Sequence, residues 1–217
     1  MEKIANYLEH TLLKPEATVE DIINLCKNAQ KYELKAVCVN PCYVDLAKHI
    51  LTNSKVLVVS VVGFPLGNTF TEVKALEAKM AVSKLADEVD MVMNLAAFKS
   101  GNLDFVVEDI KAVVEASKPC KVKVIIETCL LTDSEKKLAT KLVAKGGASF
   151  VKTSTGFNKA GASVYDVGIL RKEADKYGIG VKAAGGIRNL KTAKELIAAG
   201  ANRIGTSAGD KICEEVT

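Results

Sequence analysis

Residues 147–156 read GASFVKTSTG and residues 200–209 read GANRIGTSAG, so that Gly, Ala, Thr, Ser and Gly recur in register. Each segment joins a short run typical of a buried strand to a loop of small residues. A repeated unit of strand and exit loop is typical of a barrel built from similar units. The repeat therefore favours a closed barrel over an open doubly wound sheet, in which a G-x-G-x-x-G motif is expected after the first strand.

Outward from these two segments, short β-branched runs alternate with longer segments of helical period along the whole chain. Eight runs are candidate strands: Tyr7–His10, Ala36–Asn40, Val56–Val62, Glu88–Asn94, Val122–Glu127, Phe150–Thr153, Ile179–Ala183 and Arg203–Thr206. Helix starts are indicated by Thr18-x-x-Asp21, Thr132-x-x-Glu135 and Ser163-x-x-Asp166, and helix ends by Gly146, Gly178 and Gly200. The sequence predicts an α/β fold, a (β/α)8 TIM barrel, with residues 1–217 forming a single domain. Because the chain is short for this fold, the last helix, within residues 208–217, is expected to be brief.

Composition narrows the classes of function. The 217 residues are 48% hydrophobic and 26% charged, as in an ordinary globular domain. The net charge is +4, but Arg171, Arg188 and Arg203 are the only arginines, which disfavours a nucleic-acid partner and favours a small anion. The longest apolar stretch, Val56–Leu66, is too short to span a membrane. Six cysteines without a C-x-x-C motif and an N-terminus without an apolar signal core predict reduced thiols and a cytoplasmic protein.

Strand alternation selects the charged side chains that point into the barrel. If the apolar Met91 and Met93 face the helices, Asp90 points inward, and the same alternation directs Lys152 and Lys182 inward from neighbouring strands. Burying such charges without a function is expensive. Because one cation beside another favours a free amine, the two lysines predict a Schiff-base site. The alternative is a structural pair, in which Asp90 neutralises one of the lysines.

Two glycine-rich loops follow the last two predicted strands. They contain Gly185-Gly186-Ile187-Arg188 and Gly205-Thr206-Ser207. Barrels commonly bind phosphate on backbone N–H groups in this position, so the loops predict an anion site. Lys123 and Glu127 are both expected to point inward from the fifth strand. The default expectation for them is a structural ion pair, and the alternative is a secondary role in ordering the two lysines. Cys38 is expected to be a packed thiol.

Motifs from nearly the whole chain resemble those of the deoxyribose-phosphate aldolase family. They are EHTLLKPEAT (9–18), VCVNP (37–41), VVGFPLG (61–67), EVDMVMN (88–94), KVIIET (123–128), FVKTSTGF (150–157), VKAAGGIR (181–188) and RIGTSAG (203–209). The resemblance implies a class I aldolase on a (β/α)8 barrel. Such an enzyme cleaves 2-deoxy-D-ribose 5-phosphate to D-glyceraldehyde 3-phosphate and acetaldehyde, and neither a metal nor another cofactor is implied. We expect a homodimer or a larger homo-oligomer, because barrels of this kind often dimerise.

The resemblance also implies roles for individual residues. Lys152 corresponds to the imine-forming nucleophile, Lys182 to the neighbouring cation that assists it, and Asp90 to the acid/base that moves protons through a water. These are the three residues that strand alternation selects independently. The implied phosphate-binding residues are Gly156, Gly185, Gly186, Gly205 and Ser207, with Arg188 as an auxiliary charge.

Three positions depart from the family pattern. Glu9 stands where Asp is frequent, so the geometry of the proton relay is expected to change if this carboxylate takes part. Ala208 replaces a second serine found in some members, which removes one phosphate donor. Residues 214–217 lack the tyrosine-ended tail of some members.

The sequence leaves two other functions open. A phosphosugar isomerase on the same barrel would be expected to use a catalytic Glu and His and to need no paired lysines. A catalytically silent binding module is disfavoured because both lysines and the aspartate are retained.

Overall fold

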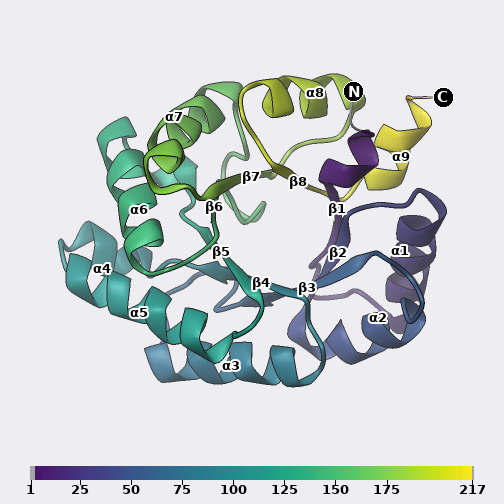
Figure 1. The fold of residues 1–217 in the computed structure, drawn as a ribbon, viewed down its shortest axis with the longest axis horizontal. Helices are drawn as coiled ribbons and strands as arrows, with labels where there is room; N and C mark the ends of the chain where they lie inside the picture. Colours follow the sequence, from purple (N-terminus) through teal and green to yellow (C-terminus); the bar gives the residue numbers. More distant parts are fainter. Residues whose placement is uncertain (1–2, 217) are drawn as a thin grey trace.

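A computed structural model describes residues 3–216, and Figure 1 shows a ring of strands enclosed by helices. In that range eight parallel strands close into a barrel in sequence order, with β8 pairing with β1. The strands are β1 (Leu8–Leu12), β2 (Ala36–Val39), β3 (Leu57–Val62), β4 (Glu88–Val92), β5 (Lys121–Ile125), β6 (Phe150–Lys152), β7 (Gly180–Ala184) and β8 (Arg203–Thr206). The predicted (β/α)8 barrel is confirmed, and each candidate strand is present with its ends shifted by no more than two residues.

Helices cover the outside of the barrel (Figure 1). They are α1 (Val19–Lys31), α2 (Val44–Ile50), α3 (Thr71–Ser83), α4 (Leu95–Lys99), α5 (Leu103–Ala116), α6 (Asp133–Lys145), α7 (Val164–Ala174), α8 (Leu190–Ala198) and α9 (Gly209–Glu214). Short 3-10 turns are η1 (Ile4–Tyr7), η2 (Pro41–Tyr43), η3 (Thr128–Leu130) and η4 (Asp175–Tyr177). The last helix is brief, as predicted, and Thr217 lies outside the described residues. Between residues 3 and 216, none of the helices is long and apolar enough to cross a membrane.

The predicted helix starts are present. Thr18 caps α1 and Thr132 caps α6. In each case the carboxylate of the third helical residue also accepts a hydrogen bond from the backbone N–H of the cap residue. Ser163 caps α7 by accepting a hydrogen bond from the backbone N–H of Asp166. These caps satisfy backbone donors that a helix start otherwise leaves unpaired. Each of these helices therefore begins at a defined residue and fixes the loop that leads to it.

The barrel interior differs from the layer between strands and helices. Met91 and Met93 belong to the large apolar cluster beneath the helices, as strand alternation predicts. Inside the barrel, the side formed by β1–β3 holds a small apolar cluster that includes Val59, Val61 and Cys38. Burial raises the pKa of the Cys38 thiol to about 11, so Cys38 is a packed neutral thiol at neutral pH, as predicted. The rest of the interior holds charged side chains from β4–β8 and from β1, where Glu9 is completely buried.

Candidate active site

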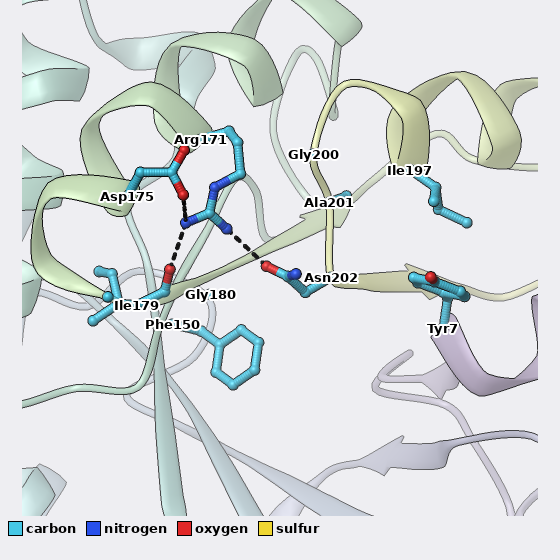
Figure 2. Close-up of a pocket in the computed structure, with 11 residues that line it drawn as sticks. Tyr7, Phe150, Arg171, Asp175, Ile179, Gly180, Ile197, Gly200, Ala201 and Asn202 are labelled. Carbon is cyan, nitrogen blue, oxygen red and sulfur yellow. Dashed lines mark hydrogen bonds and ion pairs between the residues drawn. The ribbon is translucent and has the colours of Figure 1, made fainter. Parts of the chain in front are cut away.

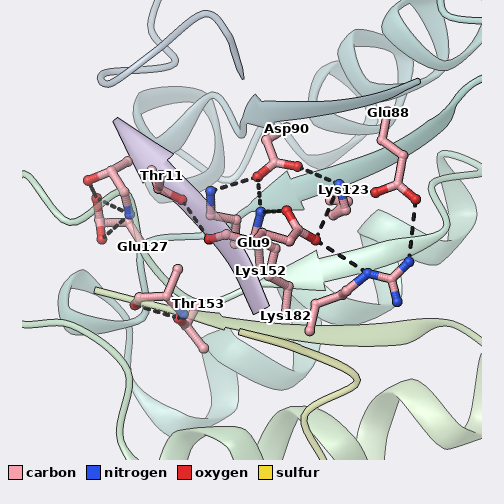
Figure 3. Close-up of polar contacts among 12 residues, drawn as sticks. Glu9, Thr11, Glu88, Asp90, Lys123, Glu127, Lys152, Thr153 and Lys182 are labelled. Atoms are coloured by element: carbon pink, nitrogen blue, oxygen red, sulfur yellow. Dashed lines mark hydrogen bonds and ion pairs between the residues drawn. The ribbon is translucent and has the colours of Figure 1, made fainter. Parts of the chain in front are cut away.

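Asp90 is the centre of the charged cluster and lies completely buried on β4. Its Oδ2 accepts hydrogen bonds from Lys152 Nζ on β6 and Lys182 Nζ on β7, each at 2.7 Å (Figure 3). Its Oδ1 accepts from Lys123 Nζ on β5 at 2.9 Å. Parallel pairing sets this arrangement, because Lys152 is the register partner of Lys182 and Asp90 that of Lys123. The three predicted catalytic residues therefore lie in direct contact.

A further set of charges surrounds these lysines. Glu9 on β1 contacts Lys182 through Oε2, and its Oε1 lies 3.4 Å from Arg203 Nε on β8. Glu88 Oε2 lies 2.6 Å from Lys123 Nζ, and Glu88 Oε1 lies 3.5 Å from Arg203 Nη2. Figure 3 shows one continuous chain of contacts through these side chains. Buried charges are tolerable when they are paired in this way.

The ionisation states in the cluster follow from these contacts. Burial alone would raise the pKa of Asp90, but Lys123, Lys152 and Lys182 hold it well below its usual value. Burial alone would lower the pKa of Lys182, but the carboxylates of Asp90 and Glu9 raise it above its usual value. The pKa of Lys123 is raised by the same two carboxylates against the same burial effect. At neutral pH, Asp90 is a carboxylate, and Lys182 and Lys123 are ammonium groups.

The formal charges of the cluster do not cancel. Four basic side chains, Lys123, Lys152, Lys182 and Arg203, meet three carboxylates, those of Glu9, Glu88 and Asp90, which leaves one positive charge in excess. Lys152 contacts one carboxylate, whereas Lys182 contacts two. Lys152 is therefore the lysine of the cluster with the fewest carboxylate partners.

A cavity of about 410 Å³ opens above Lys152 at the carboxyl ends of β6, β7 and β8. Its walls include Lys152 and all six residues predicted to bind phosphate: Gly156, Gly185, Gly186, Arg188, Gly205 and Ser207. Asp90 and Lys182 lie fully buried beneath it and do not line it. Of the three predicted catalytic residues, Lys152 is therefore the one that a ligand in the cavity meets directly.

Glycine is required at two positions in these loops. Gly185 has a φ of +91°, and a Cβ added to it would lie 2.9 Å from the Cα of Gly161. A Cβ on Gly205 would lie 3.1 Å from Lys182 Cε. The first glycine lets two loops meet closely at the cavity wall, and the second leaves room for the buried lysine.

The predicted ion pair between Lys123 and Glu127 is wrong. Lys123 binds Asp90 and Glu88, and the Glu127 carboxylate accepts hydrogen bonds from Thr155, at 2.5 Å from Oγ1 and 3.2 Å from the backbone N–H. The reason is that β5 ends at Ile125, before Glu127, so strand alternation no longer applies there. Glu127 has a left-handed φ of 52°, which turns its side chain toward the loop after β6.

Two members of the cluster and parts of the cavity wall were not predicted. Glu88 lies two residues before Asp90 on β4, and Arg203 lies two residues before Gly205 on β8. Residues two apart on a strand point to the same side, so strand alternation could have predicted that both side chains point into the barrel. Lys14 and Phe157 line the cavity from loops, where alternation gives no information. In residues 3–216, no group of three or more His, Cys, Asp or Glu side chains is arranged to hold a metal ion.

A second hollow, of about 680 Å³, lies at the opposite end of the barrel (Figure 2). Its main polar side chain is Arg171, whose Nη1 donates to Asn202 Oδ1 at 2.9 Å. Arg171 Nη2 donates to the backbone oxygen of Ile179 at 2.8 Å and lies 2.7 Å from Asp175 Oδ1. The terminal nitrogens of this guanidinium are thus bound to the protein, so the site with reactive groups is the Lys152 cavity.

A (β/α)8 barrel with a lysine amine at the carboxyl ends of its strands, beside a buried carboxylate and a glycine-rich anion loop, defines an enzyme of the aldolase class. The chain matches the model of the DeoC/LacD family aldolases over residues 5–215 and belongs to that family.

Named relatives agree with this assignment. The chain is 54% identical over 215 residues to the deoxyribose-phosphate aldolase of Streptococcus gordonii, covering 99% of this chain and 97% of that protein. It is 55% identical over 215 residues to the deoxyribose-phosphate aldolase of Thermococcus gammatolerans, covering 97% and 95%. Among solved structures, the tetrameric deoxyribose phosphate aldolase from Aeropyrum pernix superposes with a TM-score of 0.92 at 35% identity, covering 98% of this chain and 90% of the other.

Proposed function

We propose that this protein is a class I aldolase that reversibly cleaves 2-deoxy-D-ribose 5-phosphate to D-glyceraldehyde 3-phosphate and acetaldehyde, with Lys152 as the imine-forming nucleophile. One observation carries the proposal. Lys152 is held 2.7 Å from the buried Asp90 carboxylate and lines the same cavity as the glycine-rich loops after β6, β7 and β8. An amine and an anion site in one cavity suit a substrate with an aldehyde at one end and a phosphate at the other.

The chemistry needs an imine because cleavage places electrons on carbon. The Lys152 amine adds to the C1 aldehyde, and loss of water from the carbinolamine gives a protonated imine. The C3 hydroxyl then loses its proton and the C2–C3 bond breaks. The electron pair of this bond forms a C1=C2 double bond, and the imine electrons move onto the Lys152 nitrogen, which gives an enamine. D-glyceraldehyde 3-phosphate leaves, C2 gains a proton, and water then releases acetaldehyde and the free amine.

Asp90 and Lys182 are proposed to move the protons for these steps. Asp90 Oδ2 binds both Nζ atoms at 2.7 Å, so one carboxylate oxygen joins the nucleophile to the neighbouring ammonium group. The reaction needs Lys152 as the free amine, and the Asp90 carboxylate lies close enough to take a proton from it. Neither Asp90 nor Lys182 lines the cavity, so a water beside Lys152 would carry protons between them and the substrate.

Phosphate binding is proposed at the opposite wall of the cavity. Gly156, Gly185, Gly186, Gly205 and Ser207 offer backbone N–H groups and a hydroxyl, and the exposed Arg188 adds a positive charge. Lys14, from the loop after β1, supplies a second cation at the same cavity. The phosphate would then hold the substrate at a fixed distance from Lys152, and this binding energy would orient C1 for attack.

The proposed setting is catabolism of deoxyribose phosphates in the cytoplasm, with residues 1–217 acting as one catalytic domain. Six free cysteines suit a reducing compartment. A homodimer or larger homo-oligomer is proposed as the working state, which the tetrameric relative from Aeropyrum pernix supports by analogy.

The isomerase alternative has no support from the geometry. Proton abstraction of that kind is expected to use a Glu and a His that face the substrate. His10 accepts a hydrogen bond from the backbone N–H of Gly209 and His49 is exposed on α2, so neither lines the Lys152 cavity.

Product analysis tests the proposed function. The protein is incubated with 2-deoxy-D-ribose 5-phosphate, and acetaldehyde is followed by NADH consumption with alcohol dehydrogenase, in the presence and absence of EDTA. We expect acetaldehyde and D-glyceraldehyde 3-phosphate in equal amounts at a rate that EDTA does not change. A ketose phosphate without acetaldehyde would contradict the proposal and indicate an isomerase.

A further inference from the structure

Glu127 is a buried acidic residue that the proposed proton transfers do not use. It is 2% exposed, and Figure 3 shows it apart from the charged cluster around Asp90. Within residues 3–216 its carboxyl group forms hydrogen bonds but no ion pair with a basic side chain. Burial of a carboxyl group without a cation beside it is costly, so the hydrogen bonds of Glu127 must offset that cost.

The backbone at Glu127 is unusual as well. Its φ of 52° lies in the left-handed region, which is strained for a residue with a side chain. Glu33, in the turn after α1, has the same φ of 52°, but its side chain is 77% exposed and meets only the exposed Lys3. Two glutamates thus share one backbone conformation, and only that of Glu127 turns a carboxyl group into the protein.

Both oxygens of the Glu127 carboxyl group bind Thr155. Oε2 accepts a hydrogen bond from Thr155 Oγ1 at 2.5 Å, and Oε1 accepts one from the Thr155 backbone N–H at 3.2 Å. Thr155 Oγ1 in turn accepts a hydrogen bond from the backbone N–H of Phe157 at 3.1 Å. We call residues 155–157 the β6 exit loop. In the described chain no other hydrogen bond joins this loop to a different segment, and its remaining anchor is the edge-on contact of the Phe157 and Phe64 rings.

The β6 exit loop contributes to the wall of the Lys152 cavity at the proposed phosphate site. Gly156, its central residue, has a φ of +85°, and a Cβ added to it would lie 3.9 Å from the Cα of Gly185. Both glycines line the cavity. A hydrogen bond from a backbone N–H weakens steeply when the donor moves by about 1 Å. Binding of a phosphate by Gly156 therefore depends on what holds the exit loop in place.

Lys152 is held by other contacts. The Ile126 N–H donates to the backbone oxygen of Lys152 at 3.0 Å, and the Thr128 N–H donates to that of Thr153 at 2.8 Å. These hydrogen bonds join the backbones at the ends of β5 and β6 and do not involve the Glu127 side chain. Loss of the Glu127 carboxyl group should therefore release the exit loop and leave the nucleophile in place.

We propose that Glu127 is a positioning residue that holds the Gly156 N–H in place for the phosphate of the substrate. It acts through Thr155 and does not line the cavity itself. The left-handed backbone at Glu127 is what directs the carboxyl group toward Thr155. This role rests on the proposed function, because it assigns Glu127 a part in binding the phosphate of 2-deoxyribose 5-phosphate. Glu127 should thus affect substrate affinity and leave imine formation unchanged.

Steady-state kinetics of Glu127→Gly test this role, since glycine accepts the left-handed backbone and removes only the carboxyl group. We expect KM for 2-deoxyribose 5-phosphate to rise at least about tenfold and kcat to stay within about threefold. With 2-deoxyribose, which has no phosphate, kcat/KM should stay within about twofold of the parent value. The matched control is Glu33→Gly, at the same φ on the surface, which should keep the parent constants for both substrates.

Variants of Thr155 test the same contact from its other side. Thr155→Val removes the hydroxyl that donates to Glu127 Oε2 and should raise KM for 2-deoxyribose 5-phosphate at least about threefold. Thr155→Ser keeps this hydroxyl and should recover most of the lost affinity. Circular dichroism and thermal unfolding establish that each variant is folded. If Thr155→Val and Thr155→Ser have the same KM as the parent protein, the role of Glu127 is overturned.

Trapping with acetaldehyde and borohydride separates this role from the proposed function. Acetaldehyde carries no phosphate, so the parent protein and Glu127→Gly should form the Lys152 adduct at the same rate. A parent protein that forms no adduct and cleaves no substrate would overturn the proposed function and the role of Glu127 with it. If the parent protein is active and Glu127→Gly keeps its KM, or loses kcat equally on both substrates, only the positioning role is overturned.

Discussion

The two ends of the barrel carry hollows formed in part by the same three strands, and the two hollows differ in how their basic side chains are bound. At the amino ends of β6, β7 and β8 the space measures about 680 Å³, against about 410 Å³ at their carboxyl ends. The two hollows differ in what their basic side chains contact. Arg171 at the large hollow is bound to Asn202, Ile179 and Asp175, whereas Lys152 at the small one has a single carboxylate contact and faces the cavity.

The position of the proposed active site follows from the end of the barrel and not from the volume of the hollow. In (β/α)8 barrels, the carboxyl ends of the strands hold the reacting groups and the amino ends contribute stability. Lys152 lies at the carboxyl end of β6 and is the fourth basic side chain of a buried network that has three carboxylates. Arg171 instead ties α7 to the start of β7 and to the turn before β8. Substitutions at the two ends should therefore separate activity from stability.

The largest effect on activity is expected from Lys152→Ala. Removing the proposed nucleophile should reduce the rate of cleavage at least about 10⁴-fold, since no other lysine lines the cavity near Asp90. Thermal unfolding should remain cooperative, because the substitution also removes the excess positive charge. Lys152→Arg is the matched control, which keeps the charge without a primary amine and should be equally inactive. Residual activity of either variant within tenfold of the parent protein would refute the proposed role.

Asp90→Asn should give the next largest effect. The substitution keeps the shape but removes the carboxylate that binds Lys152, Lys182 and Lys123, so kcat should fall about 10²–10⁴-fold. Stability should also fall, because four basic groups would then face two carboxylates. Steady-state kinetics and urea unfolding measure the two effects. If Asp90→Asn kept both the parent kcat and the parent free energy of unfolding, Asp90 would have no role in catalysis or in stability.

Arg188→Met should act on substrate binding. Loss of one of the two cations at the cavity wall should raise KM about tenfold and change kcat little, because the phosphate lies away from the reacting carbons. Lys14→Met should behave in the same way, and Lys194→Met on the exposed face of α8 is the matched control. Steady-state kinetics with 2-deoxyribose 5-phosphate and with 2-deoxyribose distinguish the effects. If either variant impairs the two substrates equally, the phosphate site lies elsewhere.

The pH dependence of stability should also follow the cluster. The raised pKa of Lys182 and of Lys123 stabilises the folded state below the unfolded lysine pKa, at about pH 10.4, and this stabilisation is lost as the pH rises further. The lowered pKa of Asp90 stabilises the fold above about pH 3.9, and that contribution is lost at lower pH. Urea unfolding between pH 8 and 11 should show a decline in the parent protein that Asp90→Asn makes shallower. An equally steep decline in both proteins would assign the alkaline loss to other groups.

Arg171→Met, at the opposite end, should leave activity unchanged. The substitution removes two hydrogen bonds and an ion pair, so the free energy of unfolding should fall by about 1–3 kcal/mol, while kcat/KM stays within about twofold. Its pH profile should keep the shape of the parent profile, because Arg171 lies at the other end of the barrel from the Lys152 cavity. A large loss of activity without a loss of stability would mean that the larger hollow serves the reaction.

Much of the fold and the site follows from the sequence, because strand alternation reports directly which side chains enter a closed barrel. It places Asp90, Lys152 and Lys182 inside, and the two glycine-rich loops that the sequence singles out, after β7 and β8, both line the Lys152 cavity. Alternation does not report which inward side chains meet across the barrel. The contact of Glu9 with Lys182 depends on strand stagger and barrel closure, and so was not predicted as an ion pair.

The wrong pairing of Lys123 with Glu127 has a local cause. Strand alternation fails past Ile125, because the backbone leaves the strand there and Glu127 adopts a left-handed conformation. The exposed apolar side chains of α3, which are Val73, Leu76 and Met80, were missed for a different reason. Helical periodicity gives apolar positions in α3, but which face turns inward is decided by the buried pair of Lys74 and Asp109, which is visible only in the folded chain.

Trapping of the imine tests the central claim most directly. The protein is incubated with acetaldehyde or with 2-deoxyribose 5-phosphate, reduced with sodium borohydride, and analysed by peptide mass spectrometry. We predict one stable two-carbon adduct from acetaldehyde, located on Lys152, with parallel loss of activity and no adduct on Lys182 or Lys123. An active protein whose Lys152 remains unmodified after reduction, or an adduct confined to another lysine, would contradict the assignment of Lys152 as the nucleophile.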